Sequence, residues 1–89
     1  MGIKQNEMSK IKTFKDLEFY PHSVVKGGVH AFMEFPGGGW ISVVGGDGVY
    51  GDGKTTFEVL SSQNEEEPAG YQSKEEVSKI MADIQTPVI

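Results

Sequence analysis

The residues best suited to chemistry lie in a glycine-rich stretch near the middle of the chain. Residues 48–55, Gly-Val-Tyr-Gly-Asp-Gly-Lys-Thr, fit the GxxxxGK[ST] pattern of phosphate-binding loops. In such a loop, backbone N–H groups cradle the phosphates, a lysine meets the terminal phosphates and a hydroxyl binds magnesium. The candidate phosphate-binding residues are therefore Gly48, Gly53, Lys54 and Thr55.

The surrounding sequence disfavours nucleotide binding by this loop. A phosphate-binding loop leads into a helix, whereas residues 55–59 have the composition of a strand. Residues 46–51 also fit GxGxxG, but neither the helix nor the acidic residue of a dinucleotide fold is visible. Because twelve of the 89 residues are glycine, such matches arise easily by chance.

Metal binding and catalysis find little support in the residue pattern. Asp47, Asp52 and Glu58 span twelve positions, as in a calcium-binding loop, but the third and fifth positions offer no carboxylate. His22 and His30 could form a metal pair or a base, yet no third ligand is obvious. We therefore expect no metal, no other cofactor, no catalytic residue and no enzymatic activity.

Composition narrows the range of partners. The net charge is −5, with thirteen acidic residues, eight dispersed lysines and no arginine, so binding to nucleic acid or to an anionic membrane is disfavoured. There is no cysteine, and no apolar run approaches the length of a membrane span. We expect a cytoplasmic protein. The acidic run 65–67 reads as a solvated loop, or as a contact for a basic partner.

The elements that would position these residues follow from hydrophobic periodicity. Residues 29–35 alternate apolar and other side chains, residues 36–39 form a turn, and residues 40–44 are again rich in strand formers. This pattern predicts a hairpin in which Phe35 lies opposite either Trp40 or Ile41. The second register is favoured because it gathers the apolar residues on one face. Residues 55–60 read as a third strand.

The last element is a helix. Ser73 and Glu76 form a capping box, and an apolar stripe follows at helical spacing: Val77, Ile80, Met81 and Ile84. A helix this short must dock, and the apolar sheet face is available. The sequence therefore predicts a single α+β domain over residues 13–86, with a small antiparallel sheet of three to four strands, one C-terminal helix packed on one face, and a flexible arm over residues 1–12. Met8 is an alternative start.

Several aromatic residues exceed the needs of so thin a core. They are Trp40, Phe32, Tyr50, Phe19 and Tyr20, which either complete the core or form an exposed contact patch, since Trp and Tyr anchor interfaces. Asp47 and Asp52 would then supply polar contacts at the rim. The interface candidates are Trp40, Tyr50, Phe32, Asp47 and Asp52.

The chain resembles a group of small, uncharacterised proteins encoded by bacteriophages and prophages. The resemblance covers residues 13–85 and departs at the hairpin, where Asn-Gly-Tyr-Gly is expected and Gly-Gly-Gly-Trp stands at 37–40. It carries no catalytic signature. The residues that carry it are Phe14-Lys15-Asp16-Leu17, Phe19, Pro21, His22, Ala31, Phe35, the glycine turn, Ser42-Val43-Val44, Tyr50-Gly51, Glu75-Glu76-Val77, Ile80 and Ile84.

This resemblance implies a phage accessory protein that acts in the host cytoplasm. We expect a non-enzymatic protein that binds a host or phage protein as an inhibitor would, and the negative charge favours a basic partner. One alternative is a small-ligand or nucleotide-binding protein that uses the loop 45–55. Another is a structural homo-oligomer, such as a homodimer, because a thin sheet with an uncovered face or edge can pair with itself.

Overall fold

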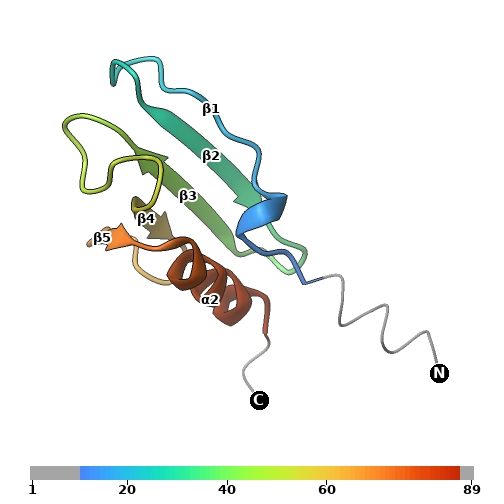
Figure 1. Cartoon of the computed structure of the whole chain (residues 1–89). Coiled ribbons are helices and arrows are strands. Elements are labelled where there is room, and N and C mark those ends of the chain that lie inside the picture. The colour runs from blue at the N-terminus through green and yellow to red at the C-terminus, as the bar shows by residue number, and fades with distance from the viewer. Residues whose placement is uncertain (1–10, 87–89) are drawn as a thin grey trace.

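The computed structural model describes residues 11–86, in which an antiparallel sheet carries one helix on one of its faces (Figure 1). The five strands lie in the order β1-β2-β3-β4-β5, so each pairs with its neighbour in the chain. The elements are a 3-10 turn η1 (Phe14–Asp16), the strands β1 (Tyr20–Pro21), β2 (Val29–Glu34), β3 (Trp40–Gly45), β4 (Phe57–Ser61) and β5 (Ala69–Gln72), and the helix α2 (Lys74–Gln85).

The α+β class is confirmed, but the predicted three to four strands are too few. Beyond the three runs predicted above, the structure adds the two-residue strand β1 at one edge of the sheet and β5 at the other. β5 lacks an alternating pattern, its pairing with β4 is irregular between Phe57 and Val59, and Tyr71 has a positive φ of 56°. Its pairing with β4 therefore fixes a segment whose own composition does not favour a strand.

The β2–β3 hairpin has a register that neither predicted alternative matches. Phe35 lies opposite Gly39, to which its N–H donates a 2.8 Å hydrogen bond, and Glu34 lies opposite Trp40. The loop is therefore residues 36–38. Since this register differs by two residues from the favoured one, it preserves the face of every side chain. Phe35, Ile41 and Val43 are buried, with Met33 partly buried beside them.

The core lies between the sheet and α2. Every second residue of the central strands faces the helix, and Ser61, at the end of β4, is the buried polar residue. The buried apolar residues are Leu17, Ala31, Phe35, Ile41, Val43, Phe57, Val59, Val77 and Met81.

The helix begins as the sequence predicts. Ser73 Oγ accepts a hydrogen bond from the Glu76 N–H (3.1 Å), and Glu76 Oε1 accepts one from the Ser73 N–H (2.8 Å). Val77 and Met81 are fully buried. Ile80 and Ile84 belong to the same predicted stripe but are only partly buried, because they lie at the border of the contact between the helix and the sheet.

The start of the described chain is attached to the helix. The Phe14 N–H donates to Ser78 Oγ (2.9 Å), while Gln85 exchanges two hydrogen bonds with the backbone of Lys12. Lys12, the last residue of the predicted arm, is therefore hydrogen-bonded to the helix. Residues 1–10 of that arm, with Met8, lie outside the described residues, as do residues 87–89. In the described part of the chain, no helix is long and apolar enough to cross a membrane.

Candidate functional site

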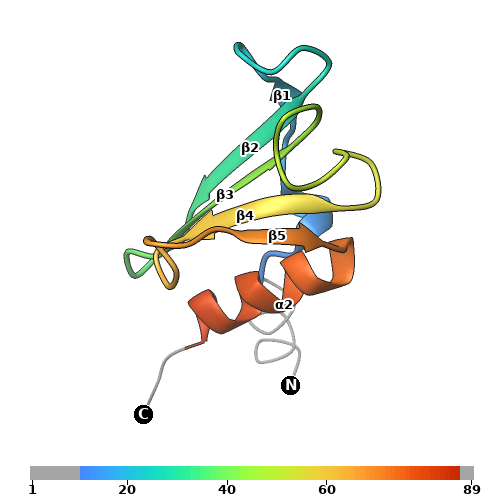
Figure 2. The same cartoon turned by 90° about the vertical axis from the view of Figure 1, so that its left-hand side faces the viewer.

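One face of the sheet carries the candidate site. Figure 2 shows α2 on one side of the sheet, and within residues 11–86 no second helix covers the opposite side. Alternation along a strand sends the even-numbered residues of β2, β3 and β4 to this opposite side, since the odd-numbered ones are those buried beneath the helix. An antiparallel sheet that is covered on one side commonly has polar residues on the other. Here the uncovered side is rich in aromatic residues.

Phe32 and Trp40 form one group on this face, near the turn of the β2–β3 hairpin. Their rings stack with centroids 5.9 Å apart and planes inclined by 27°. Phe32 remains 58% exposed, and Trp40 is half-buried. Trp40, for which core and contact positions were both open from the sequence, therefore lies outside the core and supports an exposed phenyl ring.

A second group lies at the β1 edge. Tyr20 pairs with His30 across the strands, with ring centroids 6.3 Å apart, and the His22 ring meets His30 edge-on at 5.6 Å. His22 Nδ1 accepts the N–H groups of Val24 and Val25 at 3.1 Å. A ring nitrogen that accepts these hydrogen bonds holds the loop after β1 in shape, which gives His22 a structural role.

A third group brings the glycine loop over the sheet. The Tyr50 N–H donates to Glu58 Oε1 (2.9 Å), and the Tyr71 N–H donates to the Tyr50 carbonyl (2.8 Å). The rings of Tyr50 and Tyr71 lie 5.7 Å apart, and both are more than 60% exposed. Gly70 permits this approach, because a Cβ there would lie 2.7 Å from that of Tyr50.

We call these six residues the aromatic face: Tyr20, His30, Phe32, Trp40, Tyr50 and Tyr71. Sequence reasoning did not identify Tyr71, because its strand was not recognised. The available signal was an aromatic residue two positions before the N-cap Ser73. Of the predicted interface residues, Phe32, Trp40 and Tyr50 belong to this face, whereas Asp47 and Asp52 are exposed in the glycine loop.

The charge on this side of the sheet is negative. Glu34 and Glu58 are the only Asp, Glu, Lys or Arg residues in the five strands, and both lie at even-numbered positions of the uncovered side. The Tyr20 hydroxyl donates to Glu18 Oε1 (2.8 Å). This hydrogen bond and the carboxylate's charge raise the pKa of Tyr20 above its ordinary 10.0, so the phenol remains a proton donor at neutral pH.

The loop 48–55, which matches the phosphate-binding pattern, folds around the carboxylate of its own Asp52. Asp52 Oδ1 accepts the N–H groups of Lys54, Thr55 and Thr56 at 2.8–3.0 Å, and the Thr55 hydroxyl donates to Asp52 Oδ2. These three amides, which a phosphate would need, already bind a carboxylate. The hydrogen bonds from Thr56, Lys54 and Thr55 hold the pKa of Asp52 far below its ordinary 3.8.

The acidic residues of this loop do not converge as metal ligands. Glu58 accepts the Tyr50 amide, and Asp52 is directed into its own turn. Within residues 11–86, no group of three or more histidine and carboxylate side chains could hold a metal ion.

Comparison of the chain with protein-family models, with curated proteins and with solved structures finds no match.

Proposed function

We propose that this chain is a non-enzymatic binding protein that docks a protein partner on the aromatic face. The observation that carries the proposal is the stacked Phe32–Trp40 pair on the side of the sheet that α2 leaves uncovered. Exposed apolar patches with polar surroundings mark interaction sites, and aromatic residues supply large contact area with few rotamers to order. Three of the five interface candidates named from the sequence, Phe32, Trp40 and Tyr50, belong to the same surface.

The chemistry of this face favours a basic partner. Glu34 and Glu58 lie among the aromatic rings, with Glu18 beside Tyr20. Lysine and arginine side chains can pair with such carboxylates and also lie over the aromatic rings. The net charge of −5 would accelerate the encounter.

The same charges disfavour self-association. Two copies that met through this face would bring Glu34 and Glu58 of one chain towards those of the other, and like charges in close contact are destabilising. A homodimer through the aromatic face is therefore the weaker alternative. The nucleotide alternative is weaker too, because Asp52 occupies the loop amides.

The resemblance to phage proteins extends the proposal to the source of the partner. A host or phage protein in the bacterial cytoplasm would bind this face, and the chain would act as an inhibitor by covering the surface it binds. Because the proposal requires only recognition, it assigns no reacting group to the aromatic face.

The test combines capture with a direct reporter. The tagged protein and its Phe32→Ser variant are exposed to a bacterial lysate, the bound protein is identified, and the purified partner is then titrated against the chain. Trp40 is the only tryptophan of the chain. Labelling this chain alone with 5-fluorotryptophan therefore gives one fluorine NMR resonance, which reports contact at the aromatic face without a signal from tryptophans of the partner.

The matched control is Val24→Ser, since Val24 is an apolar residue that is 83% exposed in the loop after β1. The proposal expects a basic partner that is lost with Phe32→Ser, is retained with Val24→Ser, and shifts the Trp40 resonance. Equal capture by both variants would place the interface elsewhere. Light scattering that shows a dimer which Phe32→Ser dissociates would assign the face to self-association instead.

A further inference from the structure

A small apolar cavity lies beneath the sheet, on the side opposite the aromatic face. It has a volume of about 250 Å³ and is lined by Phe14, Phe19, Val29, Phe57, Lys54 and Lys74, with the backbone of Gly53. The three phenylalanine rings pack against one another with centroids 5.1–5.5 Å apart. A cavity of about 150 Å³ holds one benzene molecule, so this one has room for an aryl ring with a short chain.

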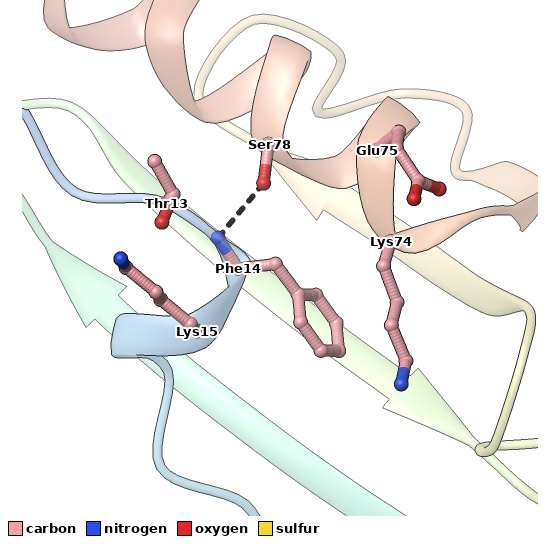
Figure 3. Close-up of a pocket in the computed structure, with 6 residues that line it drawn as sticks. All are labelled: Thr13, Phe14, Lys15, Lys74, Glu75 and Ser78. Carbon is pink, nitrogen blue, oxygen red and sulfur yellow. Dashed lines mark hydrogen bonds between the residues drawn. The ribbon is translucent and has the colours of Figure 1, made fainter.

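The two lysines give the cavity a charge opposite to that of the whole molecule. The Lys74 ammonium lies 5.7 Å from the centroid of the Phe14 ring. Figure 3 shows the Lys74 side chain extending alongside that ring and away from Glu75. Within residues 11–86, the one ion pair formed is Lys79–Asp83, so neither Lys54 nor Lys74 is neutralised by a described carboxylate.

Among residues 11–86, no acidic side chain lines the cavity. The nearest in sequence to Lys54 is Asp52, whose carboxylate is directed into the amides of its own turn. Lys54 donates to Asp52 Oδ1 through its backbone N–H, so its side-chain ammonium takes no part in that hydrogen bond. An adjoining hollow of about 460 Å³ shares Phe14 and Lys74 and is lined also by Lys15 and Glu75 (Figure 3).

We infer that this cavity is a second binding site, for a small aromatic carboxylate. The aryl ring lies in the cavity against Phe14, Phe19 and Phe57, and the carboxylate pairs with the ammonium groups of Lys54 and Lys74. A neutral apolar ligand would use only half of the site, and an amine of the same shape would meet two like charges. The site is independent of the aromatic face and of the partner proposed for it.

The test uses 4-phenylbutanoate, with 4-phenylbutylamine as the ligand of equal shape and opposite charge. Binding is followed by the NMR shifts of the backbone amides and phenylalanine rings. A ligand of this size has a dissociation constant on the order of a millimolar, so titration extends to about 10 mM. The inference expects saturable shifts at Phe14, Phe19 and Phe57 with the acid, and weaker or no shifts with the amine.

Lysine variants identify the charge contribution. Lys54→Gln and Lys74→Gln should each weaken 4-phenylbutanoate by about two- to fivefold, as for an exposed ion pair, and the double variant by more. Lys79→Gln is the control, because Lys79 lies on the same helix and pairs with Asp83. Equal binding of acid and amine, affinity unchanged in the double variant, shifts confined to the aromatic face, or no shift at the highest concentration would each overturn the inference.

Discussion

Phe32 and Trp40 stack across the β2–β3 hairpin without being directly paired in its register. Phe32 lies opposite Ser42, and Trp40 lies opposite Glu34, so their 5.9 Å contact is a diagonal one between neighbouring strands. Diagonal neighbours are close enough for aromatic side chains to meet.

Removal of the Phe32 ring should cost little stability. An aromatic pair contributes about 0.5–1.5 kcal/mol beyond its burial, and Phe32 remains more than half exposed, so Phe32→Ser should lower the free energy of unfolding by at most about 2 kcal/mol. Met81→Ala, at a fully buried position, should lower it by about 2–5 kcal/mol. Urea unfolding measures both. A larger loss for Phe32→Ser than for Met81→Ala would make Phe32 a core residue.

The partly buried Ile80 should fall between these two positions. Since it packs against the core from the border of the contact, Ile80→Ala should cost about 2 kcal/mol, the lower end for a large-to-small change. A loss near zero in the same urea experiment would show that α2 does not dock through this stripe.

Magnesium with ATP or GTP should leave the melting temperature unchanged. A ligand at a hundredfold its dissociation constant stabilises the folded state by about 2.7 kcal/mol. For a domain of this size, each kcal/mol raises melting by about 4–8 °C. We expect no rise, because the amides of Lys54, Thr55 and Thr56 are bound to Asp52. A rise of that size that Lys54→Ala abolishes would restore the phosphate-loop interpretation.

The turn at Asp52 should resist acid. Its folded pKa lies below the ordinary 3.8, so its stabilising contribution is complete above that value and is lost only as the pH falls further towards the folded pKa. The amide resonances of Thr55 and Thr56 should therefore keep their folded shifts at pH 3.8. In Asp52→Ala they should lack these shifts at every pH. Titration of both amides with a midpoint near 3.8 in the unmodified protein would contradict this.

The elements that sequence alone predicted are those with local signals. The helix start depends on Ser73 and Glu76, three residues apart, and the inward face of the hairpin depends on the two-residue period of its strands. The elements it missed depend on distant partners. β5 forms because β4 and the Tyr50 carbonyl are available to Ala69–Gln72, which no pattern within those four residues encodes.

The candidate site divides in the same way. Phe32, Trp40 and Tyr50 were identifiable as surplus aromatic residues, but their assembly on one face with Tyr71 required the path of the glycine loop. From the sequence, Asp52 is compatible with a metal ligand and with a rim residue of an interface. In the structure its carboxylate accepts the N–H groups of the residues that follow it, as Asp often does in turns. The match to the phosphate-binding pattern gives no indication of this role.

Gly39 of the hairpin has a packing role that a double-mutant cycle can measure. A Cβ at Gly39 would clash with Ile84 Cγ2 near the end of α2. Gly39→Ala should therefore lower stability, and Ile84→Ala, which removes the Cγ2 methyl, should make the same substitution less harmful by about 0.5 kcal/mol or more. Equal losses from Gly39→Ala in both backgrounds, measured by urea unfolding, would show that the helix end does not limit this position.

Charge at the aromatic face should govern the rate of partner binding. For a basic partner, Glu34→Gln and Glu58→Gln should reduce the association rate and its dependence on salt, because long-range attraction acts before contact. Glutamine at position 58 keeps an oxygen that can accept the Tyr50 N–H, so the glycine loop should keep its conformation.

Stopped-flow mixing measures the association rate. Between low salt and about 1 M, where the screening length falls to about 3 Å, the rate of the unmodified protein should fall by about tenfold. Glu75→Gln, an exposed change in the first turn of α2, is the matched control and should leave the rate nearly unaltered. If Glu75→Gln slows association as much as Glu34→Gln does, steering reflects net charge alone and the aromatic face has no privileged role in encounter.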